Sequence, residues 1–249
     1  MGAALHQVRM QVARAAATGV PVLLVGERCT GKRLAARTLR NLHGGPFAEV
    51  NCDVHPDTLG ESDIFGYEVG AFTGARVATA GKLEEASGGT LLLDEVGRLS
   101  LPAQVRLMEA IEGGTYRRLG GTEDHVFDVR LVCTTSMDLR PLVDSGDLRE
   151  DLYFRLQVMR IDLSPLRERQ QDVPLLVQHF IASAPRAPVE SAPAIDDDAL
   201  KQLCVHNCPG NVRQLRHTVE AAALAAVDGT IGPAQIRVEE SPVASDRAA

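Results

Sequence analysis

The stretch VLLVGERCTGKR, Val22 to Arg33, decides the fold class. An apolar run typical of a strand ends at Gly26, and a helical pattern follows from Lys32. Backbone N–H groups of such a corner, together with the helix N-terminus, converge on one point and favour an anion. The lysine can reach the β- and γ-phosphates of a nucleotide. An ordinary strand–turn–helix corner is the alternative. The candidate phosphate-binding residues are Gly26, Glu27, Arg28, Cys29, Thr30, Gly31, Lys32 and Arg33.

A second apolar run, GTLLLDEV (Gly89–Val96), carries two carboxylates, Asp94 and Glu95, at its end. Ligands of open α/β sheets bind at the carboxyl edge of the strands. One carboxylate can hold Mg²⁺, and the next can orient and deprotonate a water. A strand that ends in a polar turn is the alternative, and the presence of both motifs in this order argues against it.

Strand-like runs alternate with helical patterns up to about Leu166, and this alternation predicts a parallel sheet covered by helices on both faces. The expected strands are Val20–Gly26, Phe47–Cys52, Gly89–Val96, Val129–Ser136 and Gln157–Leu163. The later segments 172–183, 196–207 and 211–229 have helical patterns, with Gly229 as the expected stop. We therefore expect an α/β domain over 1–166, a small helical domain over 167–238 and a disordered tail over 239–249.

Composition excludes several classes of protein. The net charge of −7 argues against a chain that is mainly a nucleic-acid binder. No apolar run approaches the roughly 20 residues of a membrane helix, and the first residues resemble an amphipathic helix rather than a signal peptide. We expect a cytoplasmic protein without disulfides. A metal site in CVHNC (Cys204–Cys208) would need further ligands, and buried thiols are the alternative.

The motif GAFTGA, Gly70 to Ala75, places glycines on both sides of one aromatic and one hydroxyl residue. A mobile loop with an apolar tip suits contact with a partner. A hairpin turn with a buried Phe72 is the alternative.

From about Leu5 to Val238 the chain resembles the AAA+ domain of bacterial enhancer-binding proteins, the sigma-54-dependent transcription activators. The resemblance rests on ESDIFGYEVGAFTGA, GGTLLLDEVGRLSLPAQVRLMEAI, LREDLYFRL, SPLRERQQDVPLL and CPGNVRQLRH, which occur in the expected order. It implies an AAA+ P-loop NTPase with a helical lid that hydrolyses ATP with Mg²⁺ and forms a ring, usually a hexamer. The GAFTGA loop of the family engages sigma-54 and remodels its complex with RNA polymerase. By resemblance, the partner-binding residues are Gly70, Ala71, Phe72, Thr73, Gly74 and Ala75.

The resemblance also implies roles for residues at the sheet edge. Lys32 matches the phosphate lysine, Asp94 the magnesium carboxylate and Glu95 the catalytic base. Asn51 is similar to the switch asparagine that restrains this glutamate, and Thr135 stands at the first sensor position. A turn-capping side chain is the alternative for Asn51.

Three arginines match positions that link neighbouring subunits or the lid to the nucleotide. Arg149 and Arg155 resemble the fingers that reach into a neighbour's site, which would make the chemistry depend on assembly. Arg213 resembles the second sensor on the lid. For Arg149 and Arg155 the alternative is a solvated helix face with partners such as Glu150 and Asp151. For Arg213 it is an interdomain salt bridge.

Four positions depart from the family pattern: Cys29 replaces Gly, Arg33 replaces Glu, Ser136 replaces the first-sensor Asn and Cys208 replaces Trp. A Cys at a positive φ would cost about 1 kcal/mol or more. A weakly hydrolysing or non-hydrolysing regulatory module of the same fold is therefore the alternative function. A chelatase or helicase motor is disfavoured by GAFTGA.

The flanks leave one question open. We expect no sensory domain before this ATPase and no helix-turn-helix after it, so the sequence is either a piece of a longer chain or an activator without its own DNA contact.

Overall fold

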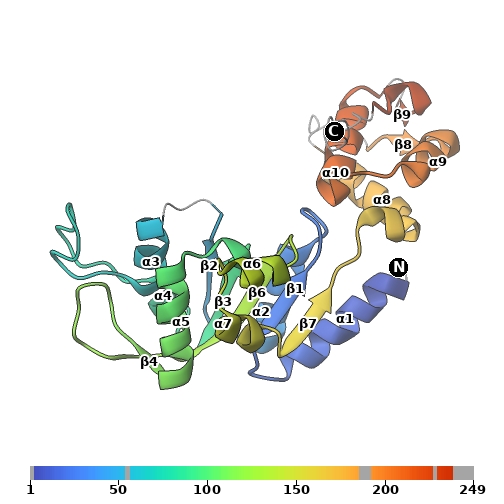
Figure 1. Ribbon diagram of the computed structural model, residues 1–249. Helices are drawn as coiled ribbons and strands as arrows, with labels where there is room; N and C mark the ends of the chain where they lie inside the picture. The colour runs from blue at the N-terminus through green and yellow to red at the C-terminus, as the bar shows by residue number, and fades with distance from the viewer. Residues whose placement is uncertain (1–2, 54–56, 185–191, 227–228, 238–249) are drawn as a thin grey trace, which may run out of the picture. The chain divides into compact units, whose positions relative to one another are not determined.

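The computed structural model describes residues 3–53, 57–184, 192–226 and 229–237 (Figure 1). They form two compact units. The α/β unit comprises Val8–Gly26 and the described residues of Lys32–Leu163. The helical unit comprises residues 3–7, Glu27–Gly31 and the described residues from Ser164 onward. The predicted tail over 239–249 lies outside the described residues, and the domain limit between 166 and 167 stays a prediction.

The α/β unit is built on a five-stranded parallel sheet with the order β2-β3-β6-β1-β7, which confirms the predicted fold class. Each predicted run contains one of its strands, β1 (Val22–Val25), β2 (Phe47–Asn51), β3 (Gly89–Asp94), β6 (Val129–Thr135) and β7 (Met159–Asp162). The register pairs Asn51 with Asp94 and Val25 with Thr135. The polar residues that follow the apolar runs therefore share one edge of the sheet.

Helices cover both faces of this sheet. One face carries α3 (Asp57–Phe65), α4 (Lys82–Glu85), α5 (Leu101–Gly113), α6 (Arg140–Ser145) and α7 (Glu150–Leu156), and the other carries α1 (Ala3–Ala16) and α2 (Lys32–His43). Successive residues of β3 serve opposite faces: Leu91 and Leu93 pack in the first core and Leu92 in the second. This two-sided burial explains why β3 is a continuous apolar run rather than an alternating one.

The helical unit has a core of its own, in which Val177, Leu203, Leu215 and Val219 are buried. Its elements are η2 (Leu166–Glu168), η3 (Gln170–Asp172), α8 (Val173–Ser183), β8 (Ala194–Ile195), α9 (Asp197–Val205), α10 (Asn211–Leu224), β9 (Thr230–Ile231) and η4 (Pro233–Gln235). The three predicted helices are present.

The predicted end of the last helix at Gly229 is wrong, because α10 ends at Leu224. The chain has to turn so that β9 can pair parallel with β8. Gly229 adopts a φ of 71°, and its carbonyl accepts the N–H of Ala194 at 2.9 Å. The glycine thus serves the entry to β9 rather than the end of the helix.

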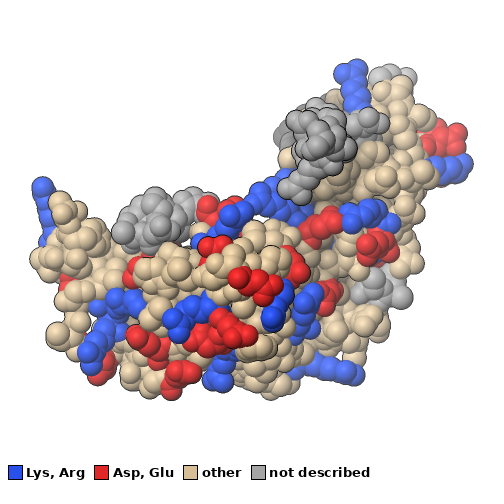
Figure 2. Space-filling view, in the orientation of Figure 1, with Lys and Arg blue, Asp and Glu red and all other residues tan. Residues whose placement is uncertain are grey.

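Two short connections lie beside the main sheet. The hairpin strands β4 (Thr115–Tyr116) and β5 (His125–Val126) follow α5, and η1 (Val96–Arg98) follows β3. Figure 2 shows acidic and basic side chains mixed over the visible face, without a continuous basic stripe. Across the described part of the chain, none of the helices combines the length and the apolar character needed to cross a bilayer.

Candidate active site

Glu95 lies directly after β3 and is held at the sheet edge by three hydrogen bonds. Its N–H donates to the hydroxyl of Thr134 at 3.1 Å, and its Oε2 accepts from the N–H and the hydroxyl of Ser136, both at 2.8 Å. Its backbone is left-handed, with φ 59° and ψ 54°, which costs on the order of 1 kcal/mol or more for a residue other than glycine. The surrounding strands therefore impose both its backbone and its carboxylate orientation.

Lys32, the first residue of α2, brings a positive charge to the same edge. Its amine donates to the carbonyl of Gly26 at 2.7 Å and lies 3.5 Å from Oε1 of Glu95. Only 6% of the side chain is exposed. The predicted phosphate lysine and the predicted catalytic base are thus adjacent within the α/β unit.

Both oxygens of Asp94 accept hydrogen bonds from the protein. Oδ1 accepts from the hydroxyl of Thr134, and Oδ2 accepts from Arg33 at 2.9 Å. The guanidinium of Arg33 also lies 2.6 Å from a carboxylate oxygen of Glu49. Thr134 is fully buried, and the sequence analysis missed it.

The donor set at this edge fits Mg²⁺, which is bound in proteins by one or two carboxylates together with substrate phosphates. Asp94 and Glu95 supply carboxylates at the end of β3. Within the described ranges, no group of three or more His, Cys, Asp or Glu side chains gathers as an all-protein metal cage. The residues therefore suit a metal that arrives with phosphate ligands, and they suit a structural metal poorly.

The structure separates the two neighbouring candidates for the first sensor. The hydroxyl of Thr135 donates to the carbonyl of Met137 at 3.0 Å and accepts its N–H at 3.2 Å. Ser136, noted in the sequence only as a departure, is the residue that contacts Glu95. The sensor role of Thr135 stays a prediction.

Asn51, at the end of β2, is the register partner of Asp94. Its side-chain oxygen accepts the N–H of Asp53 at 3.1 Å, which is the turn-capping arrangement considered as the alternative. The predicted switch role of Asn51 stays a prediction.

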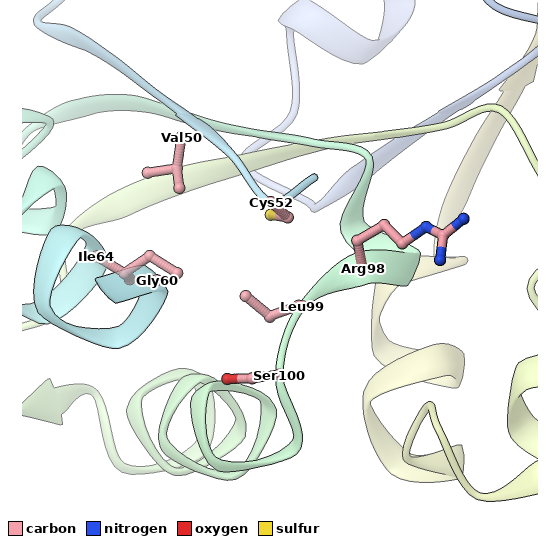
Figure 3. A pocket seen from close by; sticks show the side chains of 7 residues that line it. All are labelled: Val50, Cys52, Gly60, Ile64, Arg98, Leu99 and Ser100. Atoms are coloured by element: carbon pink, nitrogen blue, oxygen red, sulfur yellow. The ribbon is translucent and has the colours of Figure 1, made fainter. Parts of the chain in front are cut away.

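A small pocket lies beside this turn, lined by Val50, Cys52, Gly60, Ile64, Arg98 and Leu99 among others (Figure 3). Burial, with the nearby Asp94 charge, raises the pKa of the Cys52 thiol to about 12. The thiol is therefore protonated at neutral pH and does not act as a nucleophile there.

The two candidate finger arginines belong to α7 and its N-terminal boundary. Arg149 precedes the helix, forms two hydrogen bonds with Asp151 at 3.1 and 2.7 Å, and is 43% exposed. Arg155 lies exposed in the last turn. Both are exposed, and Arg149 also has the local partner that the alternative predicts.

Within the helical unit, three consecutive carbonyls of the segment Glu27–Gly31 accept hydrogen bonds from the later chain. Asn211 donates to the carbonyl of Arg28 at 3.1 Å, Val212 to Cys29 at 3.2 Å, and Arg169 to Thr30 at 2.6 Å. The segment is therefore held through its carbonyl groups by the residue that follows η2 and by the start of α10.

Glu27 and Asn211 lie at the centre of the hydrogen bonds that hold this segment, which we call the clamp. Arg167 donates to both oxygens of Glu27 at 2.9 and 2.6 Å, and the Asn211 amide donates to the same carboxylate at 3.0 Å. The bonds from Arg167 and then Asn211 lower the pKa of Glu27 below its ordinary value of 4.5. Asn211 also accepts the N–H of Leu166 and is 1% exposed with φ 51°. The sequence analysis missed Asn211, whereas the predicted second sensor, Arg213, is exposed in the first turn of α10.

Cys29 has a φ of 64°, so the condition for strain at this position is met. Gly31, two residues later, has a φ of 109°, which is readily accessible only to glycine. The segment therefore contains one glycine that suits its backbone and one cysteine that does not.

The GAFTGA motif lies in the segment 67–80, which projects away from the sheet next to α3 and α4 (Figure 1). The backbones of Gly66 and Gly81 touch at its base: a Cβ on Gly81 would lie 2.3 Å from the nitrogen of Gly66. Above this neck, Tyr67 and Thr79 exchange backbone hydrogen bonds at 3.0 and 2.8 Å. Phe72 is 43% exposed and packs edge-on against Tyr67, so the alternative of a buried Phe72 is wrong.

Comparison with known proteins identifies both parts of the chain. Residues 1–162 match the model of the sigma-54 interaction domain, and residues 167–247 match that of the AAA+ ATPase lid domain. A DNA-binding transcriptional regulator NtrC from Azospirillum brasilense is 44% identical over 92% of this chain and 48% of its own length. The sigma-54-dependent transcriptional activator SfnR of Pseudomonas putida is 41% identical over 87% of this chain and 60% of its own.

A solved structure, NtrX from Brucella abortus in complex with ATP, superposes with a TM-score of 0.87 at 29% identity, covering 99% of this chain and 57% of NtrX. The chain spans about half the length, or less, of the first curated relatives it matches.

Proposed function

Because the chain belongs to the sigma-54 interaction domain family of AAA+ ATPases, we propose that it is the ATP-hydrolysing domain of a sigma-54-dependent transcription activator. The observation that carries this proposal is the contact between Lys32 and Glu95 beside Asp94, at the carboxyl edge of the sheet. The same unit also presents the exposed GAFTGA segment. A phosphate-binding charge, a base and a partner-binding loop are what ATP-driven remodelling requires.

Each residue at the edge has a proposed task in hydrolysis. Lys32 neutralises the β- and γ-phosphates, and Glu95 orients the attacking water and accepts its proton. Asp94 holds Mg²⁺, which supplies charge neutralisation along the phosphates when bound. Ser136 and Thr134 keep the carboxylate and the backbone of Glu95 in place. Asn51 and Thr135 are the remaining candidates for sensing the nucleotide state.

Assembly is part of the proposal. Arg149 and Arg155 are exposed on or beside one helix, and an arginine supplied by a neighbouring subunit stabilises the charge of a transferring phosphoryl group. We assign them as trans-acting groups in a homo-oligomeric ring of hexameric type. Arg213 is the proposed second sensor of the helical unit.

The proposed partner surface is the segment 67–80, with Phe72 and Thr73 at its tip and sigma-54, bound to RNA polymerase, as its target. The apolar side chains Val69, Phe72 and Val77 are 65%, 43% and 71% exposed. Exposed apolar side chains on a projecting segment gain free energy when a partner covers them.

The test is ATP hydrolysis over a protein concentration series, with Glu95→Gln beside the wild type. Glutamine keeps the size of the side chain at the left-handed position but removes the base. We expect turnover per subunit to rise with concentration, because sites are shared between subunits, and to fall by at least about a hundredfold in the variant. Glu61→Gln, which changes a partly buried carboxylate on α3 away from the sheet edge, is the control.

A second measurement tests the partner. Sigma-54 should bind the wild type in the presence of an ATP analogue and fail to bind Phe72→Ala, whose turnover should be unchanged. Absence of nucleotide binding would overturn the proposed function. Nucleotide binding without turnover at any concentration would overturn hydrolysis and leave a regulatory module.

A further inference from the structure

Arg33 occupies a position that brings it over the carboxylates of two neighbouring strands. It is the second residue of α2, which covers the sheet face that contains Leu92. Asp94 follows Leu92 by two residues, and Glu49 is the register partner of Leu92, so both carboxylates emerge on this face. The guanidinium therefore bridges β2 and β3 at the start of the helix.

The bridge occupies one oxygen of Asp94, and the other oxygen is already hydrogen-bonded. Thr134 already donates to Oδ1, and Arg33 donates to Oδ2 at 2.9 Å. A guanidinium and a divalent cation on the same oxygen would be like charges within about 4 Å and would repel each other. Mg²⁺ can therefore take Oδ2 only if Arg33 releases it.

Release of Asp94 leaves Arg33 with a partner. Its second contact, with Glu49 at 2.6 Å, does not involve Asp94, and half of the Arg33 side chain is exposed. Rotation of this exposed group therefore suffices, without movement of the buried strands. Until then, the arginine neutralises a carboxylate that would otherwise repel the phosphates of a nucleotide without Mg²⁺.

We propose that Arg33 is a built-in counter-cation of Asp94 that competes with Mg²⁺. This inference rests on the proposed nucleotide binding. The consequence is a weak coupling between Mg²⁺ and nucleotide: the chain binds nucleotide without Mg²⁺ better, and gains less from Mg²⁺, than it would with a neutral residue at this position. Coupling of this kind is reciprocal, so it can be measured from the nucleotide side alone.

The test is the dissociation constant of a fluorescent ADP, measured at equilibrium with EDTA and with saturating Mg²⁺. The ratio of the two constants reports the coupling and needs no hydrolysis. In Arg33→Gln we expect this ratio to rise about three- to tenfold above the wild type, because an exposed ion pair and a nearby positive charge are both removed. Arg33→Glu, which introduces the residue common in the family, should raise it further.

Arg37→Gln is the matched control, since it removes the same charge one turn further along α2, where the side chain is exposed. Its ratio should equal that of the wild type. Equal ratios for Arg33→Gln and Arg37→Gln would overturn the inference and leave the proposed function intact. If the thermal melt shows that Arg33→Glu folds and Arg33→Gln does not, the ratio for Arg33→Glu is compared with that for Arg37→Gln, and equal ratios would again overturn the inference. A wild type that binds no ADP under either condition would overturn both.

Discussion

Two loops of this chain both contain a Thr-Gly pair but differ in their hydrogen-bond partners. In Glu27–Gly31, the carbonyls of Arg28, Cys29 and Thr30 accept from residues more than 130 positions later in the sequence. In the GAFTGA segment the turn bonds are internal, with Gly70 donating to Ala75 and Ala75 donating to Phe72. The first loop is held by distant residues of its unit. The GAFTGA turn closes on itself, and the segment that carries it is bonded from outside near its base, where Glu68 donates its N–H to Leu119 and accepts from Arg118.

This difference shows that the presence of glycine in a loop does not determine whether the backbone of the loop is fixed or its side chains are exposed. A loop whose carbonyls are captured from outside presents a fixed backbone, as an anion cradle needs. A loop closed by its own turns keeps its apolar side chains exposed, as a partner-binding tip needs. The surroundings of the loop, more than its composition, decide which of the two it becomes.

The largest effect on stability is expected from a substitution that removes the clamp on the first loop. Asn211→Ala removes the donor to Glu27 and Arg28 and the acceptor of Leu166, and places alanine at a φ of 51°. We expect a loss of about 2–4 kcal/mol in the free energy of unfolding, measured by urea denaturation. The exposed Asn207→Ala is the control, and a loss below about 1 kcal/mol for Asn211→Ala would contradict the clamp.

A smaller effect of opposite sign is expected at Cys29. Glycine tolerates a φ of 64° without strain, so Cys29→Gly should stabilise the protein by about 0.5–1 kcal/mol in thermal unfolding. Cys204→Gly, in the last turn of α9, should instead destabilise it by about 1 kcal/mol. The same sign for both variants would show that backbone strain at Cys29 is not released.

Acid should also weaken the clamp, because Glu27 loses its charge. The pKa of Glu27 is lowered in the folded state, so its contribution is present above about pH 4.5 and is lost as the pH falls through the lowered value. We expect the difference in stability between the wild type and Glu27→Gln to shrink from pH 7 to pH 3.5. A constant difference across this window, in unfolding measured at each pH, would exclude a depressed pKa.

The smallest effect on stability is expected at the tip of the second loop. Phe72→Ala should change the free energy of unfolding by less than about 0.5 kcal/mol, because the side chain lies on an exposed segment. Phe65→Ala, at a fully buried position on α3, should cost about 3–5 kcal/mol. A large loss for Phe72→Ala would mean that its ring contact with Tyr67 supports the fold.

The sheet was predictable because its central strands are buried on both faces and are therefore continuous apolar runs. Asp94 and Glu95 were predictable for a related reason, since they follow such a run directly. Lys32 was predictable because it begins the helical pattern after the glycine-containing loop that follows another run. The exposure of Phe72 could not be derived from residues alone, which left a buried ring as an alternative.

The contacts between distant segments were not predictable. Asn211 and Glu27 are separated by 184 positions, and nothing local to either residue reveals the hydrogen bond. Thr134, Thr135 and Ser136 are adjacent hydroxyl residues, and only the strand register decides that Thr134 faces Asp94 while Ser136 faces Glu95. The end of α10 depended on the pairing of two-residue strands, which is too short a signal to recognise.

The neck formed by Gly66 and Gly81 has a consequence for how this domain can be rebuilt. The two ends of the projecting segment meet in backbone contact, so the span between them is the same whatever lies above. Loop-closure entropy grows slowly with length. Segments of other lengths and sequences can therefore replace this one between the two glycines, while the sheet and its helices stay unchanged.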